Sequence, residues 1–194
     1  KLKEIGAYGK VWPFYGIIAG FVSNKSAVSN PPDAWEGLPD RDARLVTPPF
    51  NTDNVYAILR REWDEDRTKS YFKDLYAAFD KFPSNHTVTV QEVIGGQSDI
   101  GVHIFLGSSL PDNAPVNISF APWTSNHVEG AAMSKQAPHP NASKAFIQWL
   151  TSQEGQLAMQ DYGGGLPAYP DVDHGNEQIQ AALDEYDPTI YRDL

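Results

Sequence analysis

A chain of 194 residues, 41% hydrophobic and 21% charged, is long enough to form one large or two small globular domains. Its net charge of −10 argues against nucleic acid and anionic membrane surfaces as partners, because both require a basic face. The sequence has no cysteine, which excludes disulfides, thiolate metal sites and cysteine nucleophiles. No apolar run approaches the ~18 residues of a membrane-spanning helix.

The first half of the chain alternates short apolar runs with amphipathic stretches. Residues 11–24 are dense in aromatic and aliphatic side chains, and they predict a buried strand over Gly16–Val22. A second strand is expected at Arg44–Thr47. Residues 51–53 are of helix-capping types, and the apolar periodicity that follows them predicts a helix. The charge run at 62–69 favours a solvated loop or helix face.

The second half continues the same alternation, with a short helix expected over Thr87–Gly96 and a loop at 121–127 before the last strand. This pattern predicts an α/β fold, a three-layer lobe with a central mixed sheet. The predicted strands are Gly16–Val22, Arg44–Thr47, Ile100–Phe105, Val116–Phe120 and Val128–Met133.

The stretch 129–165 predicts a strand, a corner and two packed helices. Two prolines at 138 and 140 fix the corner, and Asn141 is the expected N-cap of the first helix. An apolar face recurs from Ala142 to Leu150 at helical spacing. Thr151 and Glu154 have the spacing of a capping box, so a second helix is expected to begin there.

The string APHPNASKAFIQWLTSQEGQ in this stretch resembles the C-terminal signature of ABC-transporter solute-binding proteins. The similar group binds iron(III), phosphonates, sugar phosphates, thiamine or polyamines. The resemblance implies a periplasmic-binding-protein-like (type II) fold, a small-molecule solute and an ABC permease in the membrane as partner. It also implies an exported protein, periplasmic or extracellular and lipid-anchored in some members, although no signal peptide is visible. No cofactor is implied.

The resemblance also predicts how the chain is divided. Residues 1–125 would form mainly the second (middle) lobe, and 126–194 a C-terminal segment whose helix pair packs on the first lobe. The segment resembling Gly6–Val22 falls well inside the family's mature chain, so we expect a fragment that lacks most of the N-terminal lobe. An exposed cleft face would then favour self-association.

Asn51, Thr52 and Asp53 are the first candidate ligand-binding residues. Their ordinary role is helix capping. The functional alternative is that the free N–H groups of this helix start bind an anionic part of a ligand. In the family that the sequence resembles, the loop at this position contacts ligand.

The end of the strand at 100–105 departs from the iron-binding pattern of the family. Iron(III)-binding members carry two adjacent tyrosines there, because hard Fe³⁺ favours phenolate oxygen. Ile104 and Phe105 occupy the matching positions and offer no oxygen. His103 precedes them and is a candidate ligand-binding residue, although a lone histidine is more often a hydrogen-bonding wall residue. The tyrosine form of iron binding is therefore not expected.

Flat aromatic side chains complete the candidate ligand-binding set: Trp12, Tyr15, Phe105 and the loop residue Trp123. They suit stacking on a sugar, a base or a quaternary amine, whereas a loop tryptophan beside proline is about as often a packing anchor. We expect a small polar organic solute, with a phosphate or carboxylate suggested by the helix start. The acidity of the whole chain points towards a cation such as a polyamine or thiamine.

No catalytic motif is present, so an enzyme is the least favoured class. Beside a transport protein with an organic solute, two functions of the same fold stay open. One is a sensory or regulatory ligand-binding domain. The second is an iron(III)-binding protein of this kind that uses ligands different from tyrosine.

Overall fold

The computed structural model describes residues 11–49, 52–107, 110–163, 166–167 and 175–192. One mixed sheet organises them, and its main path runs in the order β3-β2-β4-β1-β6-β8, with β5 and β7 also paired to β1. The strands are β1 (Val11–Asn24), β2 (Leu45–Val46), β3 (Phe79–Lys81), β4 (Ile100–Leu106), β5 (Val116–Ser119), β6 (Trp123–Ala132), β7 (Leu166–Pro167) and β8 (Thr189–Arg192). The helices are α2 (Thr52–Glu62), α3 (Glu65–Ala78), α4 (His86–Ile94), α5 (Pro140–Leu150), α6 (Gln153–Gly163) and α7 (Glu177–Tyr186).

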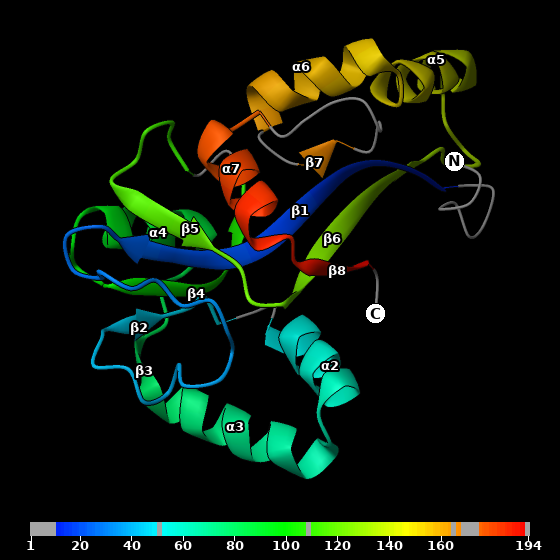
Figure 1. Ribbon diagram of the computed structural model, residues 1–194. Helices are drawn as coiled ribbons and strands as arrows, with labels where there is room; N and C mark the ends of the chain where they lie inside the picture. Colours follow the sequence, from blue (N-terminus) through cyan, green and yellow to red (C-terminus); the bar gives the residue numbers. More distant parts are fainter. Residues whose placement is uncertain (1–10, 50–51, 108–109, 164–165, 168–174, 193–194) are drawn as a thin grey trace.

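Strand β1 is the centre of the sheet. Its first half pairs antiparallel with β6 and β7, and its second half with β4 and β5. Strand β2 is parallel to β3 and to β4, and β6 is parallel to β8, so the sheet is mixed as predicted. In Figure 1, β1 runs as a long blue arrow through the middle of the molecule, with α2 and α3 on one side of the sheet and α7 on the other.

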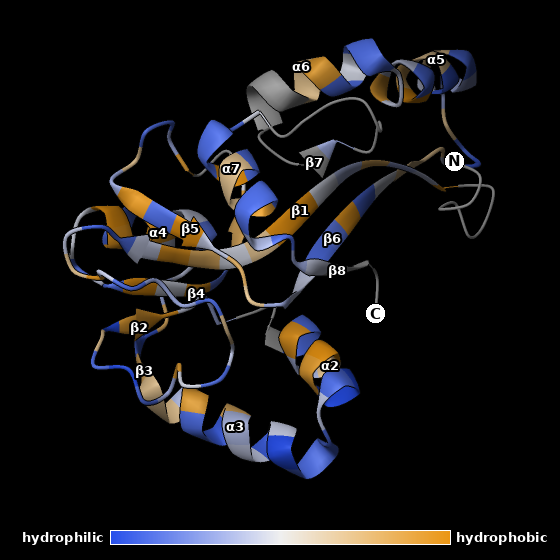
Figure 2. Ribbon diagram, viewed as in Figure 1, coloured by the Kyte–Doolittle hydropathy of each residue, from blue (hydrophilic) through white to orange (hydrophobic). Residues whose placement is uncertain are grey.

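Two apolar cores lie on the two faces of the sheet. Ile18 and Val22 of β1 point into one core, which is closed by α4 and α7. Phe21 points into the other core, which is closed by α2, α3 and Trp35 of the segment after β1. The hydropathy colouring of Figure 2 shows the corresponding orange stretches along β1 and on the sheet-facing sides of the helices. This three-layer arrangement is the α/β fold expected from the sequence.

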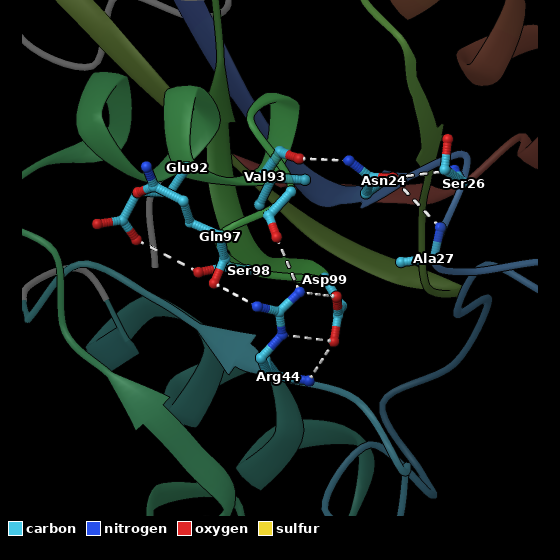
Figure 3. A network of polar contacts seen from close by, with 10 residues as sticks. Asn24, Ser26, Ala27, Arg44, Glu92, Val93, Gln97, Ser98 and Asp99 are labelled. Carbon is cyan, nitrogen blue, oxygen red and sulfur yellow. Dashed lines mark hydrogen bonds and ion pairs between the residues drawn. The ribbon is translucent and has the colours of Figure 1, made fainter.

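Polar contacts close the amino ends of β2 and β4, just before each strand begins (Figure 3). Arg44 donates from Nη2 to Asp99 Oδ1 at 2.6 Å, from its backbone N–H to Asp99 Oδ2 at 2.8 Å, and to the carbonyls of Gly96 and Gln97 at 2.9 Å. The hydrogen bond from Arg44 lowers the pKa of Asp99. At the end of β1, Asn24 donates to the Val93 carbonyl at 2.7 Å and accepts from two backbone N–H groups.

Three local predictions are wrong. Strand β6 begins at Trp123, so most of the predicted loop at 121–127 is strand. Helix α5 has His139 as its N-cap residue, and Asn141 lies inside the helix because Pro140 already occupies its first position. At the start of α6 the capping oxygen is Ser152 Oγ, which accepts from Gly155 N–H at 3.2 Å, whereas Thr151 Oγ1 donates back to the Ile147 carbonyl at 2.9 Å.

Candidate functional site

The candidate site lies at the carboxyl ends of the parallel strands β2 and β4. In open α/β sheets, ligands bind at this edge, where strands lead into loops and helix starts. Strand β2 leads towards the first turn of α2, and β4 ends with His103, Ile104, Phe105 and Leu106. The opposite, amino ends of these strands carry the Arg44–Asp99 contacts. The two ends of the same strands thus have different chemistry.

Phe105 is surrounded by three imidazole rings. The ring of His86 stacks on it at 4.6 Å between centroids and 11° between planes, and the ring of His127 at 6.0 Å and 20°. His103 approaches it edge-on at 5.6 Å and 64°. Because His86 and His127 stack on the ring, Phe105 offers a solute less open aromatic surface than its sequence position suggests.

His86 is placed by the start of α4. Asn85 caps this helix by accepting from Val88 N–H at 2.9 Å, and His86 is its first residue. The Nδ1 atom of His86 accepts the backbone N–H of Phe105 at 3.1 Å, which fixes the neutral ring as the Nε2–H tautomer. Burial lowers the pKa of His86 to about 4, so the ring is uncharged at neutral pH.

His103 combines a strained backbone with an incompletely paired side chain. Its φ of 53° lies in the left-handed region, which residues other than glycine rarely adopt. The residue is 2% exposed, and its Nε2 lies 2.9 Å from Ser125 Oγ of β6. Its Nδ1 has no hydrogen-bond partner in the described part of the chain. Burial, aided by the nearby His86, lowers the pKa of His103 to about 3, so this imidazole is also neutral.

A second buried polar atom without a partner comes from the neighbouring strand. Thr47 follows β2, is 1% exposed, and its Oγ1 has no hydrogen-bond partner among the described residues. Because Val46 pairs with Gly101 in parallel register, Thr47 lies beside Val102, one residue before His103. A buried polar atom without a partner costs about 1–3 kcal/mol, and Thr47 Oγ1 and His103 Nδ1 are two such atoms on adjacent strands.

Strands β1 and β6 add a row of side chains to the same face, in which His127 and Glu129 are exposed and Tyr15 and Ile17 are half-buried. The antiparallel register opposes Tyr15 to Glu129, Ile17 to His127 and Ala19 to Phe105, and directly opposed residues share a face. His127 Nε2 lies 3.2 Å from Glu129 Oε1, and both side chains are about half exposed. Burial and the charge of Glu129 raise the pKa of Tyr15. Tyr15, Phe105 and His127 therefore form one accessible surface.

Trp12 lies near the start of β1, and Trp123 begins β6, two residues before Ser125. Trp12 is 40% exposed and lines a cavity of about 280 Å³ between the start of β1 and α5. The remaining lining residues of this cavity are Met133, Lys144, Ile147, Gln148 and Thr151. Trp123 packs against the second core, and its carbonyl accepts from Trp35 Nε1 at 2.9 Å. The Trp123 ring thus has a packing contact, and its role as a ligand contact stays a prediction.

The predicted helix start is described only in part. Asn51 and the Thr52 side chain lie outside the described residues, although Thr52 is the first residue of α2. Asp53 is exposed in the first turn of this helix, and its Oδ1 accepts the N–H of Asn54 at 3.0 Å. Ligand binding by Asn51, Thr52 and Asp53 stays a prediction.

Sequence reasoning missed His86, His127 and Thr47. The alternation Trp123, Ser125, His127, Glu129 was the available signal for His127, but it is visible only once β6 is recognised as starting at Trp123.

Across the described ranges, no group of three or more His, Cys, Asp or Glu side chains has the arrangement of a metal site. In the same ranges, no helix is long and apolar enough to cross a membrane.

The sequence model of the bacterial extracellular solute-binding proteins matches residues 3–184. The chain belongs to this family. The resemblance read from the C-terminal signature is thus confirmed, and the family consists of binding proteins of extracellular location rather than enzymes. A comparison with curated proteins gives no match.

Solved structures similar to this chain include three solute-binding proteins. Iron-bound HitA from Pseudomonas aeruginosa aligns with a TM-score of 0.76 and 17% identity, over 94% of this chain and 63% of HitA. AfuA from Actinobacillus pleuropneumoniae, bound to fructose-6-phosphate, aligns with a TM-score of 0.64 and 20% identity, over 87% of this chain and 56% of AfuA. AgtB from A. tumefaciens R10, in complex with agropinic acid, aligns with a TM-score of 0.65 and 16% identity, over 95% of this chain and 58% of AgtB.

These likenesses confirm the type II periplasmic-binding-protein fold. At such identities they establish the fold alone. The chain spans 63%, 56% and 58% of the length of the three proteins. The predicted division at residue 125 stays a prediction.

Proposed function

We propose that this chain belongs to the solute-binding component of an ABC import system, which captures a small polar solute and delivers it to a permease. The observation that carries the proposal is the site at the carboxyl ends of β2 and β4 in a chain of this family. There, the accessible row of Tyr15, Phe105 and His127 adjoins the unpaired polar atoms of Thr47 and His103. Hinged closure of two lobes around the solute is the expected working motion.

The proposed solute is organic and carries a phosphate or a carboxylate. Ile104 is fully buried in the first core, and Phe105 offers no oxygen, so the tyrosine pair of iron(III) binding has no equivalent. His86 and His103 are neutral and suit hydrogen bonding to a solute rather than charge pairing. The first turn of α2 contributes N–H groups, which favour an anion.

A calorimetric titration tests this proposal. The panel is fructose-6-phosphate, 2-aminoethylphosphonate, citrate, spermidine, thiamine and ferric citrate. We expect heat of binding with a phosphate- or carboxylate-bearing compound and a clear loss of affinity in Phe105→Ala and His127→Ala. Binding of spermidine or thiamine alone would replace the anionic class by a cationic one. Binding of ferric citrate without binding of citrate would restore the iron(III) alternative.

The proposal also covers the cellular location of the protein, its membrane partner and its self-association. We propose an exported, periplasmic or extracellular protein, lipid-anchored as some members of the family are, whose membrane partner is an ABC permease. Self-association through the exposed cleft face is part of the proposal, and the apolar side chains of Val11 and Trp12, 43% and 40% exposed, would add to the contact. Sedimentation velocity tests this point, since Trp12→Ser should shift the distribution towards monomer. An unchanged distribution would remove Trp12 from the contact.

A further inference from the structure

A second pocket is lined by residues different from those of the candidate solute site. It has a volume of about 220 Å³ and opens between α3 and the segment that follows Trp35. Its lining residues are Glu36, Gly37, Pro39, Asp40, Trp63, Arg67, Tyr71 and Asp74. The pocket therefore combines aromatic walls with three carboxylates and a single cation.

The aromatic walls already hold a guanidinium group. Trp63 and Tyr71 meet edge to face at 5.1 Å and 85°, and the Tyr71 hydroxyl donates to the Trp35 carbonyl at 2.6 Å. The guanidinium carbon of Arg67 lies 4.1 Å from the centre of the Trp63 ring. Arg67 Nη2 also lies 2.9 Å from Glu36 Oε1. A planar cation between an aromatic face and a carboxylate is the arrangement that guanidinium groups favour.

The charges around Arg67 are not balanced. Arg67 is paired with Glu36, whereas Asp40 and Asp74 form no hydrogen bond or ion pair within the described ranges. Two carboxylates on the pocket wall are thus left without a countercharge, in a chain of net charge −10. A second cation would find these carboxylates unpaired.

Arg67 is also easy to displace. Its side chain is 52% exposed and that of Glu36 is 49% exposed. Ion pairs at such exposure contribute little to stability, because water solvates both partners when they separate. An incoming guanidinium can therefore replace that of Arg67 on Trp63 at small cost, while the freed Arg67 side chain turns to solvent.

We propose that this pocket is a second binding site, which takes a guanidinium group on Trp63 in place of Arg67. Glu36, Asp40 and Asp74 then pair with the incoming group, whose planar N–H fork matches carboxylates better than a rounded ammonium does. The group is carried by a small organic solute or by an arginine side chain of a protein partner. The site is independent of the proposed solute site at β2 and β4.

An NMR titration of the whole chain tests the site. The probes are N-methylguanidinium chloride and, as its neutral isostere, N-methylurea. The signal is the indole N–H of Trp63, assigned by its absence in Trp63→Phe. Saturable shifts with the cation and none with the urea are expected. No saturable shift with N-methylguanidinium, or equal shifts with both probes, would overturn the proposal.

Two sets of variants sharpen the test. Asp40→Asn and Asp74→Asn should each weaken binding about two- to fivefold, the range of exposed charge pairs. Asp42→Asn, the same change in the same segment outside the pocket lining, should leave affinity unchanged. Arg67→Ala removes the internal competitor and should strengthen binding severalfold. Weaker binding in Arg67→Ala, or equal loss in all three Asp→Asn variants, would contradict the displacement of Arg67.

A last pair of probes separates the two sources of the guanidinium. The tripeptide Ac-Gly-Arg-Gly-NH₂ and its citrulline counterpart present the same group on a backbone. Tighter binding of the arginine peptide than of N-methylguanidinium would indicate a protein partner, because neighbouring backbone then adds contacts. Equal or weaker binding would indicate a small solute. Both outcomes require that the citrulline peptide does not bind.

Discussion

The two ends of β2 and β4 differ in how completely their polar groups are paired. At the amino ends, Arg44 and Asp99 bond to each other and Arg44 also reaches two backbone carbonyls, while Ser23 Oγ, opposite Ile100, has no partner among the described residues. At the carboxyl ends, Thr47 Oγ1 and His103 Nδ1 are buried without a partner in the described structure. Buried polar groups in proteins are nearly always paired, so the contacts of Arg44 and Asp99 stabilise the first end, whereas Thr47 and His103 at the second end leave two acceptor or donor atoms open to a partner.

The backbone shows the same difference. Strand β4 begins in regular pairing with β2 and β1, but at His103 it passes through a left-handed conformation, and the partner strand β1 shifts register between Gly20 and Val22. Strain of this kind persists where the surrounding structure holds it, most often at binding sites. The comparison predicts that changes at the paired end lower stability, whereas changes at the unpaired end spare stability and alter binding.

The largest expected effect is the response of the unpaired end to acid. The lowered pKa values of His103, about 3, and His86, about 4, mean that the unfolded chain binds protons that the folded chain does not. Between their ordinary value of 6.5 and pH 4.5, each histidine therefore removes up to about 1.4 kcal/mol of stability per pH unit as pH falls. Well above pH 6.5 both histidines are uncharged in the folded and the unfolded chain, so they no longer change the free energy of unfolding.

Urea denaturation at several pH values from 7 to 4.5 measures this slope. His103→Asn removes one titrating group, and asparagine tolerates the left-handed backbone, so the slope should decrease by up to about 1.4 kcal/mol per pH unit. Ser125→Ala removes only the hydrogen-bond partner and should keep the slope. Asp99 does not contribute to this slope, because its pKa is lowered from an ordinary value of 3.8, which already lies below this pH window. Equal slopes for wild type and His103→Asn would show that His103 is not the acid-sensitive group.

The next effect concerns the paired end. Asn24 is 7% exposed, and its amide makes hydrogen bonds to the Val93 carbonyl and to two backbone N–H groups. Asn24→Ala removes all three, which should cost about 2 kcal/mol of unfolding free energy. Asn54→Ala is the control, because the Asn54 side chain makes no hydrogen bond in the described ranges. A loss below the error of the denaturation midpoint would mean that these contacts add nothing to stability.

A smaller effect compares two buried threonines directly. Thr124 Oγ1 donates to the Ala19 carbonyl, whereas Thr47 Oγ1 has no partner among the described residues, and the two threonines are 2% and 1% exposed. Thr124→Val should therefore cost about 1 kcal/mol, and Thr47→Val should be neutral or stabilising by up to about 1 kcal/mol. Thermal unfolding of both variants measures this difference. Thr47→Val should also weaken binding of the proposed solute, and a destabilised Thr47→Val would mean that this hydroxyl has a partner after all.

The sequence predicted the strands of the fold better than the residues of the candidate site. The core strands were predicted because buried strands need short apolar runs, and those of β1 and β4 are unmistakable. The start of β6 was missed because Ser125, Asn126 and His127 look like loop residues. Asn126 and His127 pair with Ile18 and Ile17 of β1, which lie more than a hundred residues earlier. His86 was missed for the same reason: it meets Phe105 only through the packing of α4 on the sheet.

The smallest effect on stability, and the clearest separation of binding from folding, is expected at His127. Its side chain is 49% exposed, it stacks on Phe105 at a centroid distance of 6.0 Å, and it pairs with Glu129 at 3.2 Å. An exposed side chain with one polar contact contributes little, so His127→Ala should change the unfolding free energy by less than about 0.5 kcal/mol. Because the imidazole lies on the accessible face shared with Tyr15, the same change should weaken binding of the proposed solute several-fold. Glu129→Gln keeps the imidazole and removes only its partner, so it should weaken binding less. Calorimetry on the three proteins, alongside their denaturation curves, gives both quantities. If His127→Ala lost stability and kept its affinity, the accessible row would belong to the fold rather than to the solute.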